Sequence, residues 1–339
     1  ISIRLVGSEM CIRDSVDSGT GILKIVCGAP NVKNGMKVVV AKPGDFIPGL
    51  NINLKASKIR DVKSEGMMCS EKELEISDEH DGIIELPSET EVGTLFSELV
   101  GDEKIIFEIA ITPNRPDALG IYGIARDLSA SGIGKLRVSK IPNVEGIFKP
   151  HLNINLDQAV SSKECPFFVG RYLRSVQNRE SPQWLRNRII SIGLNPISAL
   201  VDITNYLTFD RARPLHVFDA DKLSGGLTVR RSFEGEKFHA LDDKIYELNE
   251  GMIVITDEKE IVSLGGIIGG MKSAVSDQTK NVLLEAAYFD PISIAATGRK
   301  LQINSDARYR FERGVDPSFT LSGSHIATKM ILDLCGGEA

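Results

Sequence analysis

The spacing of apolar residues changes near Pro113, and this change limits the fold more than any other feature of the sequence. Residues 21–70 contain short alternating or β-branched runs, separated by turn signals such as Pro43-Gly44-Asp45. Residues 118–128 instead place apolar side chains at helical spacing. Because a short-stranded pattern and a helical pattern follow each other along one chain, the sequence predicts an α+β multidomain protein.

Length and composition set further limits. The 339 residues are enough for two or three domains, and 42% hydrophobic with 25% charged residues is typical of a soluble globular protein. No apolar run approaches the roughly 18 residues that a membrane-spanning helix needs, so no membrane partner is expected. The five cysteines are far apart and lack a CxxC motif, which excludes a zinc site and a disulfide framework and favours a reducing cytoplasm.

Charge is unevenly distributed along the chain. The net charge of −6 argues against a nucleic-acid-binding protein. However, residues 21–72 carry nine Lys/Arg against four Asp/Glu, whereas residues 73–103 carry eleven acidic residues and no Lys or Arg. The first segment could form a local phosphate-binding face, and a solvated surface is an equally good interpretation.

The first fourteen residues, ISIRLVGSEMCIRD, match neither a signal peptide nor a clear helix or strand pattern. The string LVGSEMCIRD resembles the translated adapter sequence found at the ends of assembled environmental reads. We therefore interpret residues 1–14 as a non-native leader, with a genuine irregular terminus as the alternative. Because residues 335–339 add no helix-ending signal beyond two glycines, we interpret both ends as cuts.

Local signals predict several helices and strands. Ser181-Pro182 begins a helix that ends at Gly193, and further helices are expected over 198–209 and 319–334. The expected strands are 22–27 and 36–41 in the first half of the chain, and 227–231, 252–256, 261–264 and 282–286 in the second half. The strands of the first half suggest a small barrel, followed by a short helix near 95–99. Residues 141–150 are expected to form a linker.

The glycine run 265–270, GGIIGG, is not a nucleotide-binding loop. A phosphate loop needs Lys directly after its last glycine, and here Met271 comes before Lys272. The Rossmann spacing does not fit either. Close approach of the backbone to a ligand or to another strand is the better interpretation, and a plain bulge stays open.

No other motif of the sequence indicates a metal or a nucleophile. The chain has no HExxH, GxSxG or EF-hand pattern, and its five histidines show no metal-binding spacing. A lone histidine is more often structural than catalytic. The residues alone therefore predict a soluble multidomain protein, for which RNA binding is one open alternative.

Two strings in the first half resemble a known family. IVCGAPNVKNGMKVVVAKPGDFIPG (25–49) and IRDVKSEGMMCSEKEL (59–74) are similar to the tRNA-binding domain of bacterial phenylalanyl-tRNA synthetase beta subunits, an oligonucleotide-binding (OB) barrel. The family's barrel starts some tens of residues earlier, so a truncated barrel is expected here. The resemblance makes five cations of this segment the expected tRNA contacts: Lys33, Lys37, Lys55, Lys58 and Arg60.

Further strings extend the resemblance to nearly the whole chain, in the family's order. FEIAITPNRPDALGIYGIARDLSA (107–130) resembles the small first domain of the beta subunit. The segments 184–223, 263–294 and 304–317 resemble its editing domain. The predicted organisation is a leader at 1–14, a truncated OB-type domain at 15–106, a small α/β first-domain remnant with linker at 107–145, and a mixed α/β editing domain at 146–339.

The resemblance implies the beta chain of phenylalanine–tRNA ligase, an aminoacyl-tRNA synthetase of protein biosynthesis. Its expected partners are tRNA-Phe and the alpha subunit, in a complex of two alpha and two beta chains. ATP and Mg²⁺ belong to that parent complex, and no cofactor or metal is expected in this fragment. The implied activity is hydrolysis of mischarged Tyr-tRNA-Phe, because a phenylalanine pocket cannot strongly exclude one extra hydroxyl. The alternative is a non-catalytic tRNA-docking and assembly subunit with a degenerate editing pocket.

The family's editing residues fall on matching positions of this sequence. His216 is expected beside the ester or its attacking water, and Glu285 is expected to read the tyrosine hydroxyl. Four further residues are expected to line the pocket: Gly269, Ser305, Ala307 and Asn195. Many family members have Arg at the position of Asn195, so this chain lacks a possible contact to the tRNA end or carboxylate, and the strength of its editing stays open. A structural hydrogen-bonded pair is the alternative role for His216 and Glu285.

Overall fold

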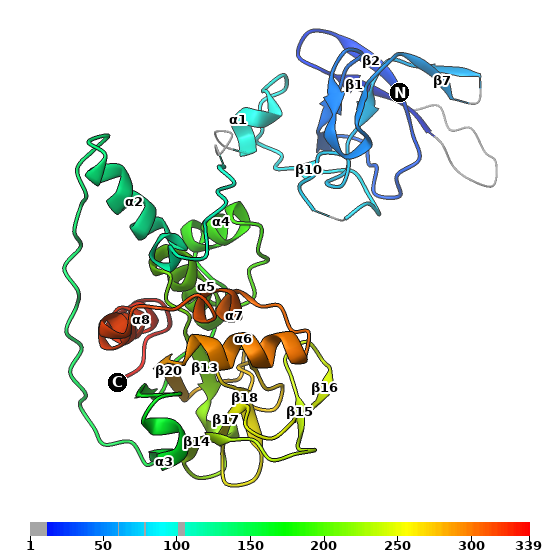
Figure 1. Cartoon of the computed structure of the whole chain (residues 1–339). Coiled ribbons are helices and arrows are strands. Elements are labelled where there is room, and N and C mark those ends of the chain that lie inside the picture. Colours follow the sequence, from blue (N-terminus) through cyan, green and yellow to red (C-terminus); the bar gives the residue numbers. More distant parts are fainter. Residues whose placement is uncertain (1–11, 60, 78, 101–105) are drawn as a thin grey trace. The chain divides into compact units, whose positions relative to one another are not determined.

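The computed structural model describes residues 12–59, 61–77, 79–100 and 106–339. These residues form two compact units, the first ending before Ile106 and the second running from Ile106 to Ala339. Both units combine strands and helices, so the predicted α+β multidomain class is confirmed (Figure 1).

The first unit is built from antiparallel strand pairs. β1 (Ile12–Asp17) pairs with β2 (Ile22–Cys27), so residues 12–14 of the expected leader lie in a strand, while residues 1–11 lie outside the described part of the chain. The other pairs are β3 (Lys37–Val38) with β10 (Glu85–Leu86), β4 (Val40–Ala41) with β9 (Met67–Met68), β5 (Phe46–Ile47) with β6 (Ile52–Asn53), and β7 (Ser57–Ile59) with β8 (Val62–Ser64). Two short helices complete the unit: η1 (Pro48–Leu50) and α1 (Phe96–Val100). These pairings do not by themselves establish a barrel, which stays a prediction.

The strand predicted over 36–41 is divided into two. Val39 separates β3 from β4, and its carbonyl oxygen accepts a hydrogen bond from the N–H of Cys69 at 3.0 Å. β3 pairs with β10, whereas β4 pairs with β9. The apolar run is therefore shared between two partners, which its composition alone could not indicate.

The second unit contains two main sheets. The five-stranded sheet has the order β11-β14-β17-β18-β19, in which β11 (Ile154–Leu156) runs parallel to β14 (Leu227–Arg231). Its other strands are antiparallel: β17 (Ile253–Thr256), β18 (Ile261–Leu264) and β19 (Ile268–Gly269). The three-stranded sheet places β20 (Val282–Tyr288) between β12 (Phe167–Leu173) and β13 (His216–Asp219). A separate hairpin joins β15 (Lys237–His239) to β16 (Ile245–Glu247).

The three-stranded sheet is buried on both faces. Leu284 of β20 packs with a cluster that includes residues of α4 (Gln183–Ser191), α5 (Ala199–Arg211) and α8 (Thr320–Cys335). Leu283, which points the other way, packs with residues of the five-stranded sheet. The unit therefore has helices on one side of β20 and the larger sheet on the other (Figure 1). Other helices of residues 150–339 are α3 (Gln158–Ser161), η3 (Ala220–Lys222), α6 (Pro291–Lys300), α7 (Asp306–Phe311) and η4 (Pro317–Phe319).

The segment 106–145 differs from its prediction. It contains η2 (Pro116–Ala118) and α2 (Ile121–Ala130) but no strand. Gly120, at the start of α2, lies so close to the end of α5 that a Cβ there would be 2.4 Å from the backbone nitrogen of Ala212. The predicted small α/β domain is thus represented by its helix, because residues 106–115 pair with no strand.

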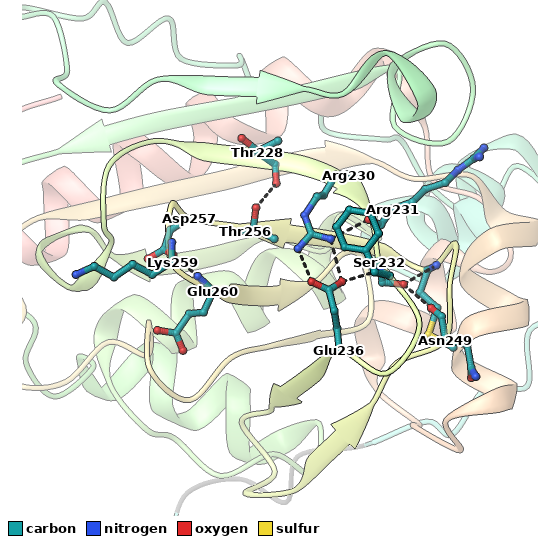
Figure 2. Close-up of polar contacts among 12 residues, drawn as sticks. Thr228, Arg230, Arg231, Ser232, Glu236, Asn249, Thr256, Asp257, Lys259 and Glu260 are labelled. Atoms are coloured by element: carbon teal, nitrogen blue, oxygen red, sulfur yellow. Dashed lines mark hydrogen bonds and ion pairs between the residues drawn. The ribbon is translucent and has the colours of Figure 1, made fainter.

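Polar side chains tie β14 to β17 at both ends (Figure 2). At one end, Ser232 accepts a hydrogen bond from the N–H of Met252 at 2.9 Å and donates to the carbonyl oxygen of Asn249. Arg230 donates to both carboxylate oxygens of Glu236, at 2.9 and 2.6 Å. At the other end, Thr256 donates to the Thr228 carbonyl oxygen at 3.3 Å, and Asp257 closes a tight turn by accepting from two backbone N–H groups.

The hydrophobic cores of the two units differ in size, which predicts different local stabilities. The first unit has only small clusters, centred on Ile47 and Ile25, and leaves side chains such as Ile22 and Phe46 exposed. Fewer buried contacts lower the free energy of local opening. We expect amides within residues 15–103 to exchange faster with deuterium than those of β17 and β20. Equal protection of both sets in a native-state hydrogen-exchange experiment would contradict this expectation.

Candidate functional site

His216 and Glu285 are directly opposite each other on neighbouring strands. They form the last pair of the antiparallel ladder between β13 and β20. Phe218, two residues after His216, packs into the cluster between the two sheets, as does Leu283, two residues before Glu285. Because alternate residues of a strand share a face, both site side chains project between the sheets.

Glu285 is a buried acid without a full set of partners. Only 6% of the residue is exposed, and its Oε2 atom has no hydrogen-bond partner among the residues that the structure describes. Burial raises the pKa of Glu285 to about 8, because the charged form loses its hydration. The group is therefore mostly a neutral carboxylic acid at neutral pH, able to donate as well as accept a hydrogen bond.

His216 also presents an unpartnered atom. Its Nε2 is buried and, within the described part of the chain, has no hydrogen-bond partner. Burial lowers the pKa of His216 to about 4. The ring packs edge-on against Phe218, with ring centroids 4.5 Å apart. Since neither Nε2 of His216 nor Oε2 of Glu285 is bonded, the alternative of a satisfied structural pair gains no support from these atoms.

Gly269 lies against the imidazole of His216. A Cβ at this position would be 2.4 Å from Cε1 and 2.7 Å from Nε2 of His216, closer than real contacts allow. The sequence predicted that the backbone of this glycine run lies close to a ligand or to another strand. In the structure, the backbone of Gly269 lies close to the imidazole of His216. The absence of a side chain at Gly269 leaves the histidine ring room beside β19.

Ser305 and Ala307 lie at the start of α7. The Ser305 hydroxyl donates to the carbonyl oxygen of Ile267 at 2.6 Å and accepts from the N–H of Arg308 at 3.0 Å. It therefore caps α7 and fastens it to the glycine run. Ala307 is half-buried and packs against the cluster between the sheets.

Asn195 is not brought into this group. It is exposed on the loop between α4 and α5, and both of these helices pack on the opposite face of the three-stranded sheet from His216 and Glu285. The structure thus brings together four of the predicted residues, His216, Glu285, Gly269 and Ser305, through β13, β20 and the glycine run, with Ala307 beside them.

Sequence reasoning missed two neighbours of Glu285. Gly170 of β12 is paired with Glu285, and a Cβ on it would be 2.1 Å from the side chain of Ile154. Cys165 is fully buried, and burial together with the nearby Glu285 carboxyl raises the pKa of its thiol. Neither residue belongs to a recognisable motif, so no sequence signal could have identified them.

The expected tRNA contacts lie in the first unit. Lys33, Lys55 and Lys58 are exposed, Lys37 is half-buried, and Arg60 lies outside the described residues. Lys33 and Lys37 line a cavity of about 750 Å³. Asp14 and Glu91 line the same cavity, so its walls carry both signs of charge.

The described residues offer neither a group of side chains that could hold a metal ion nor a helix that could span a membrane. Within residues 12–59, 61–77, 79–100 and 106–339, no three His, Cys, Asp or Glu side chains are grouped so as to hold a metal ion. Over the same ranges, every helix is too short or too polar to cross a membrane.

The fold and site can now be compared with known proteins. The family model described as the B3/4 domain matches residues 164–336, which is half of the chain and includes His216, Gly269, Glu285 and Ser305. The chain belongs to the B3/4 domain family. A tRNA-binding domain model matches residues 4–95.

Curated relatives extend the match to nearly the whole chain. The phenylalanine–tRNA ligase beta subunit of Ruegeria pomeroyi is 55% identical over 329 residues, which is 96% of this chain and 41% of the relative. The same subunit of Rhodospirillum rubrum is 53% identical over 326 residues, again 96% and 41%. The expected resemblance to the phenylalanyl-tRNA synthetase beta subunit is therefore confirmed. The chain spans about two-fifths of the length of these relatives.

A solved structure is also similar. An N-terminal fragment of the phenylalanyl-tRNA synthetase beta subunit from Pyrococcus horikoshii is 17% identical, and the match covers 55% of this chain and 58% of that one. Its TM-score of 0.34 is too low to support any argument about the fold.

The contact between Gly269 and His216 predicts the effect of one methyl group. We expect Gly269→Ala to destabilise the second unit by about 1–3 kcal/mol, because backbone or imidazole must move to admit the Cβ. The only tryptophan, Trp184, lies in α4, so its fluorescence during urea unfolding reports on this unit. Gly134→Ala is the matched control, since no atom lies within 4 Å of a Cβ there. Equal stability of the two variants would refute the contact.

Burial of Glu285 also predicts a pH dependence. Between pH 6.5 and 8, folded Glu285 keeps a proton that the unfolded chain, with a pKa near 4.5, has released. The unfolded state binds fewer protons, so stability falls as pH rises through this window. The lowered pKa of His216, about 4 against 6.5 when unfolded, gives the opposite trend only below pH 6.5.

Urea unfolding followed by Trp184 fluorescence tests this dependence. We expect the free energy of unfolding of the wild type to fall by up to about 2 kcal/mol between pH 6.5 and 8, relative to Glu285→Gln. The Gln side chain has nearly the same shape as Glu but does not ionise in this pH range. Parallel profiles for the two proteins would show that Glu285 is ionised in the folded state.

Proposed function

We propose that this chain is part of a phenylalanine–tRNA ligase beta subunit, where it binds tRNA-Phe and hydrolyses mischarged Tyr-tRNA-Phe. The observation that carries the proposal is the pair of unpartnered buried atoms, Nε2 of His216 and Oε2 of Glu285, on adjacent strands. Unbonded buried polar atoms cost stability. A ligand that bonds to both would remove this cost, and a tyrosyl ester with its attacking water has suitable groups.

Glu285 would select for tyrosine. As a neutral acid in its buried setting, it can accept the phenol proton in a hydrogen bond and donate its own proton in return. A phenylalanyl ester has no hydroxyl, so Glu285 would stay unbonded beneath its ring. The penalty for an unsatisfied buried group, about 1–3 kcal/mol, disfavours the correctly charged product.

His216 would orient the attacking water. Its low pKa, about 4, keeps the imidazole neutral at physiological pH and makes it a weak base. An unprotonated ring nitrogen can still accept a hydrogen bond from a water molecule and fix its position. The water adds to the ester carbonyl carbon, the bond to the ribose oxygen breaks, and the products are free tyrosine and the tRNA hydroxyl.

Ser305 would not act as a nucleophile in this reaction. The Ser305 hydroxyl proton is already donated to Ile267, so this residue holds α7 in place and does not attack the ester. Ala307 offers a small side chain beside the aromatic ring. Gly269 would let the backbone approach the ligand at the point where it meets His216.

Other parts of the proposal concern the whole complex. The first unit would contribute to tRNA binding through Lys33, Lys37, Lys55, Lys58 and Arg60. The alpha subunit, ATP and Mg²⁺ would be needed for aminoacylation, in a cytoplasmic complex of two alpha and two beta chains. The exposed position of Asn195 on the far side of the three-stranded sheet is the observation that favours the alternative, a docking subunit whose editing pocket is degenerate.

A deacylation assay separates these alternatives. The full chain is mixed with tRNA-Phe carrying radiolabelled tyrosine, and loss of the ester is followed with time. We expect His216→Ala and Glu285→Ala each to slow hydrolysis by about 100-fold or more, a usual cost of losing a positioned polar group.

His239→Ala is the control for the assay, because this exposed histidine bonds only to Asp243 through its ring. It should match the wild type. Deacylation at wild-type speed by the His216 and Glu285 variants would show that the site is wrong. A folded wild type without any activity would favour the docking alternative.

A further inference from the structure

Arg213 is a buried cation that the proposed reaction does not use. Only 1% of the residue is exposed, and it lies three positions before His216. Its guanidinium donates through Nη1 to the carbonyl oxygen of Ala287 at 2.9 Å, and through Nη2 to the carbonyl oxygen of Asp316. No described residue accepts a hydrogen bond from its Nε. Burying a charge that bonds mainly to neutral carbonyls costs stability, so a role other than stabilisation is a reasonable explanation for Arg213.

The hydrogen-bond pattern of the ladder explains the contact with Ala287. Just beyond the end of β13, the N–H of Ala220 donates to the carbonyl oxygen of Asn281 at 2.9 Å. In an antiparallel ladder, hydrogen-bonded pairs recur at every second residue. Counting back in this register makes His216 and Glu285 a hydrogen-bonded pair as well.

The next such pair would join position 214 to Ala287. Position 214 is proline, which has no N–H and cannot donate to the ladder. The guanidinium of Arg213 bonds to Ala287 at this point instead. A side chain thus takes the place of the missing backbone donor, directly beside the pair that contains His216.

The Nη2 atom of Arg213 connects β20 to the start of η4, because it donates to the carbonyl oxygen of Asp316. Asp316 caps η4, in the segment that follows α7, the helix that Ser305 caps. Gly323 of α8 makes room for the arginine, since a Cβ there would be 3.0 Å from its Cγ. One guanidinium therefore joins β20, the strand that carries Glu285, to the segment that follows α7.

We propose that Arg213 is a positioning residue, which substitutes for the ladder donor absent at Pro214 and so holds His216 beside Glu285. The proposal rests on the proposed hydrolysis for its kinetic consequence, but its structural part concerns the ladder alone. Arg213 touches no reacting atom. It fixes the end of β13, where a small displacement of His216 would misplace the water.

The test restores the missing donor by other means. Arg213→Met removes both hydrogen bonds, whereas Pro214→Ala adds a backbone N–H that can donate to Ala287. We expect Arg213→Met to lower kcat for Tyr-tRNA-Phe hydrolysis by on the order of 100-fold with little change in KM, as a misplaced group does. Adding Pro214→Ala should recover at least about tenfold of this loss, and Arg213→Lys should fall between. Recovery through a neighbouring backbone group is not expected of a residue that only fills space.

Arg171→Met is the matched control. Arg171 also donates to a backbone carbonyl, that of Val144 at 2.7 Å, but it is paired with Leu284, whose side chain is on the helix-facing side of the sheet. We expect it to change kcat less than twofold. Arg171 is half-buried. An equal loss in Arg171→Met and Arg213→Met would show a general cost of removing an arginine from this sheet and would overturn the proposal.

Hydrogen exchange gives a readout that does not depend on activity. Amides of residues 215–219 should exchange faster in Arg213→Met than in the wild type and slow again when Pro214→Ala is added, while β17 and β18 stay unchanged. If the wild type hydrolyses nothing, the proposed function fails, yet this pattern would still support the positioning role. Unchanged exchange in Arg213→Met and in Arg213→Lys, or no recovery with Pro214→Ala, would refute it.

Discussion

The pairing of β20 with β12 on one side and β13 on the other determines the arrangement of the second unit. Residues 282–287 of β20 are all buried, because helices cover one face of this sheet and the five-stranded sheet covers the other. A strand buried on both faces tolerates no slip in register, since a shift of one residue would exchange the two sets of side chains. That register also sets His216 opposite Glu285.

The same burial gives the candidate site its chemical character. Glu285 is the acidic residue of β20, and its neighbours in the strand, Leu284 and Ala286, are aliphatic. The Glu285 side chain is buried away from water. Its environment favours a neutral acid, and that of His216 favours a neutral imidazole. The candidate site therefore brings together two buried polar groups that both favour their uncharged forms.

Sequence reasoning succeeded where periodicity and turn residues dominate. The strands at 227–231 and 261–264 were predicted with their observed ends, and the helix after Ser181-Pro182 was predicted to within two residues. The single strand predicted over 36–41 was wrong, because this apolar run forms two strands that pair with different partners. Strand pairing depends on residues far away in the sequence, so the run itself does not indicate it. For the site, the family resemblance supplied His216 and Glu285, and Gly269 also stood out by composition. Gly170, Cys165 and Arg213 gave no local signal, since their positions depend on strands distant in sequence.

The separation of β12 and β20 along the chain has a consequence for synthesis on the ribosome. Phe167 of β12 is paired with Tyr288 of β20, which is translated more than a hundred residues later. At a translation rate of ~5–20 residues per second, β12 would wait roughly 6–24 s for its partner strand. During this time its apolar residues and open edge are available to chaperones or to other nascent chains. β20, the central strand of this sheet, is thus made late in translation, and α8, which packs on it, is made later still.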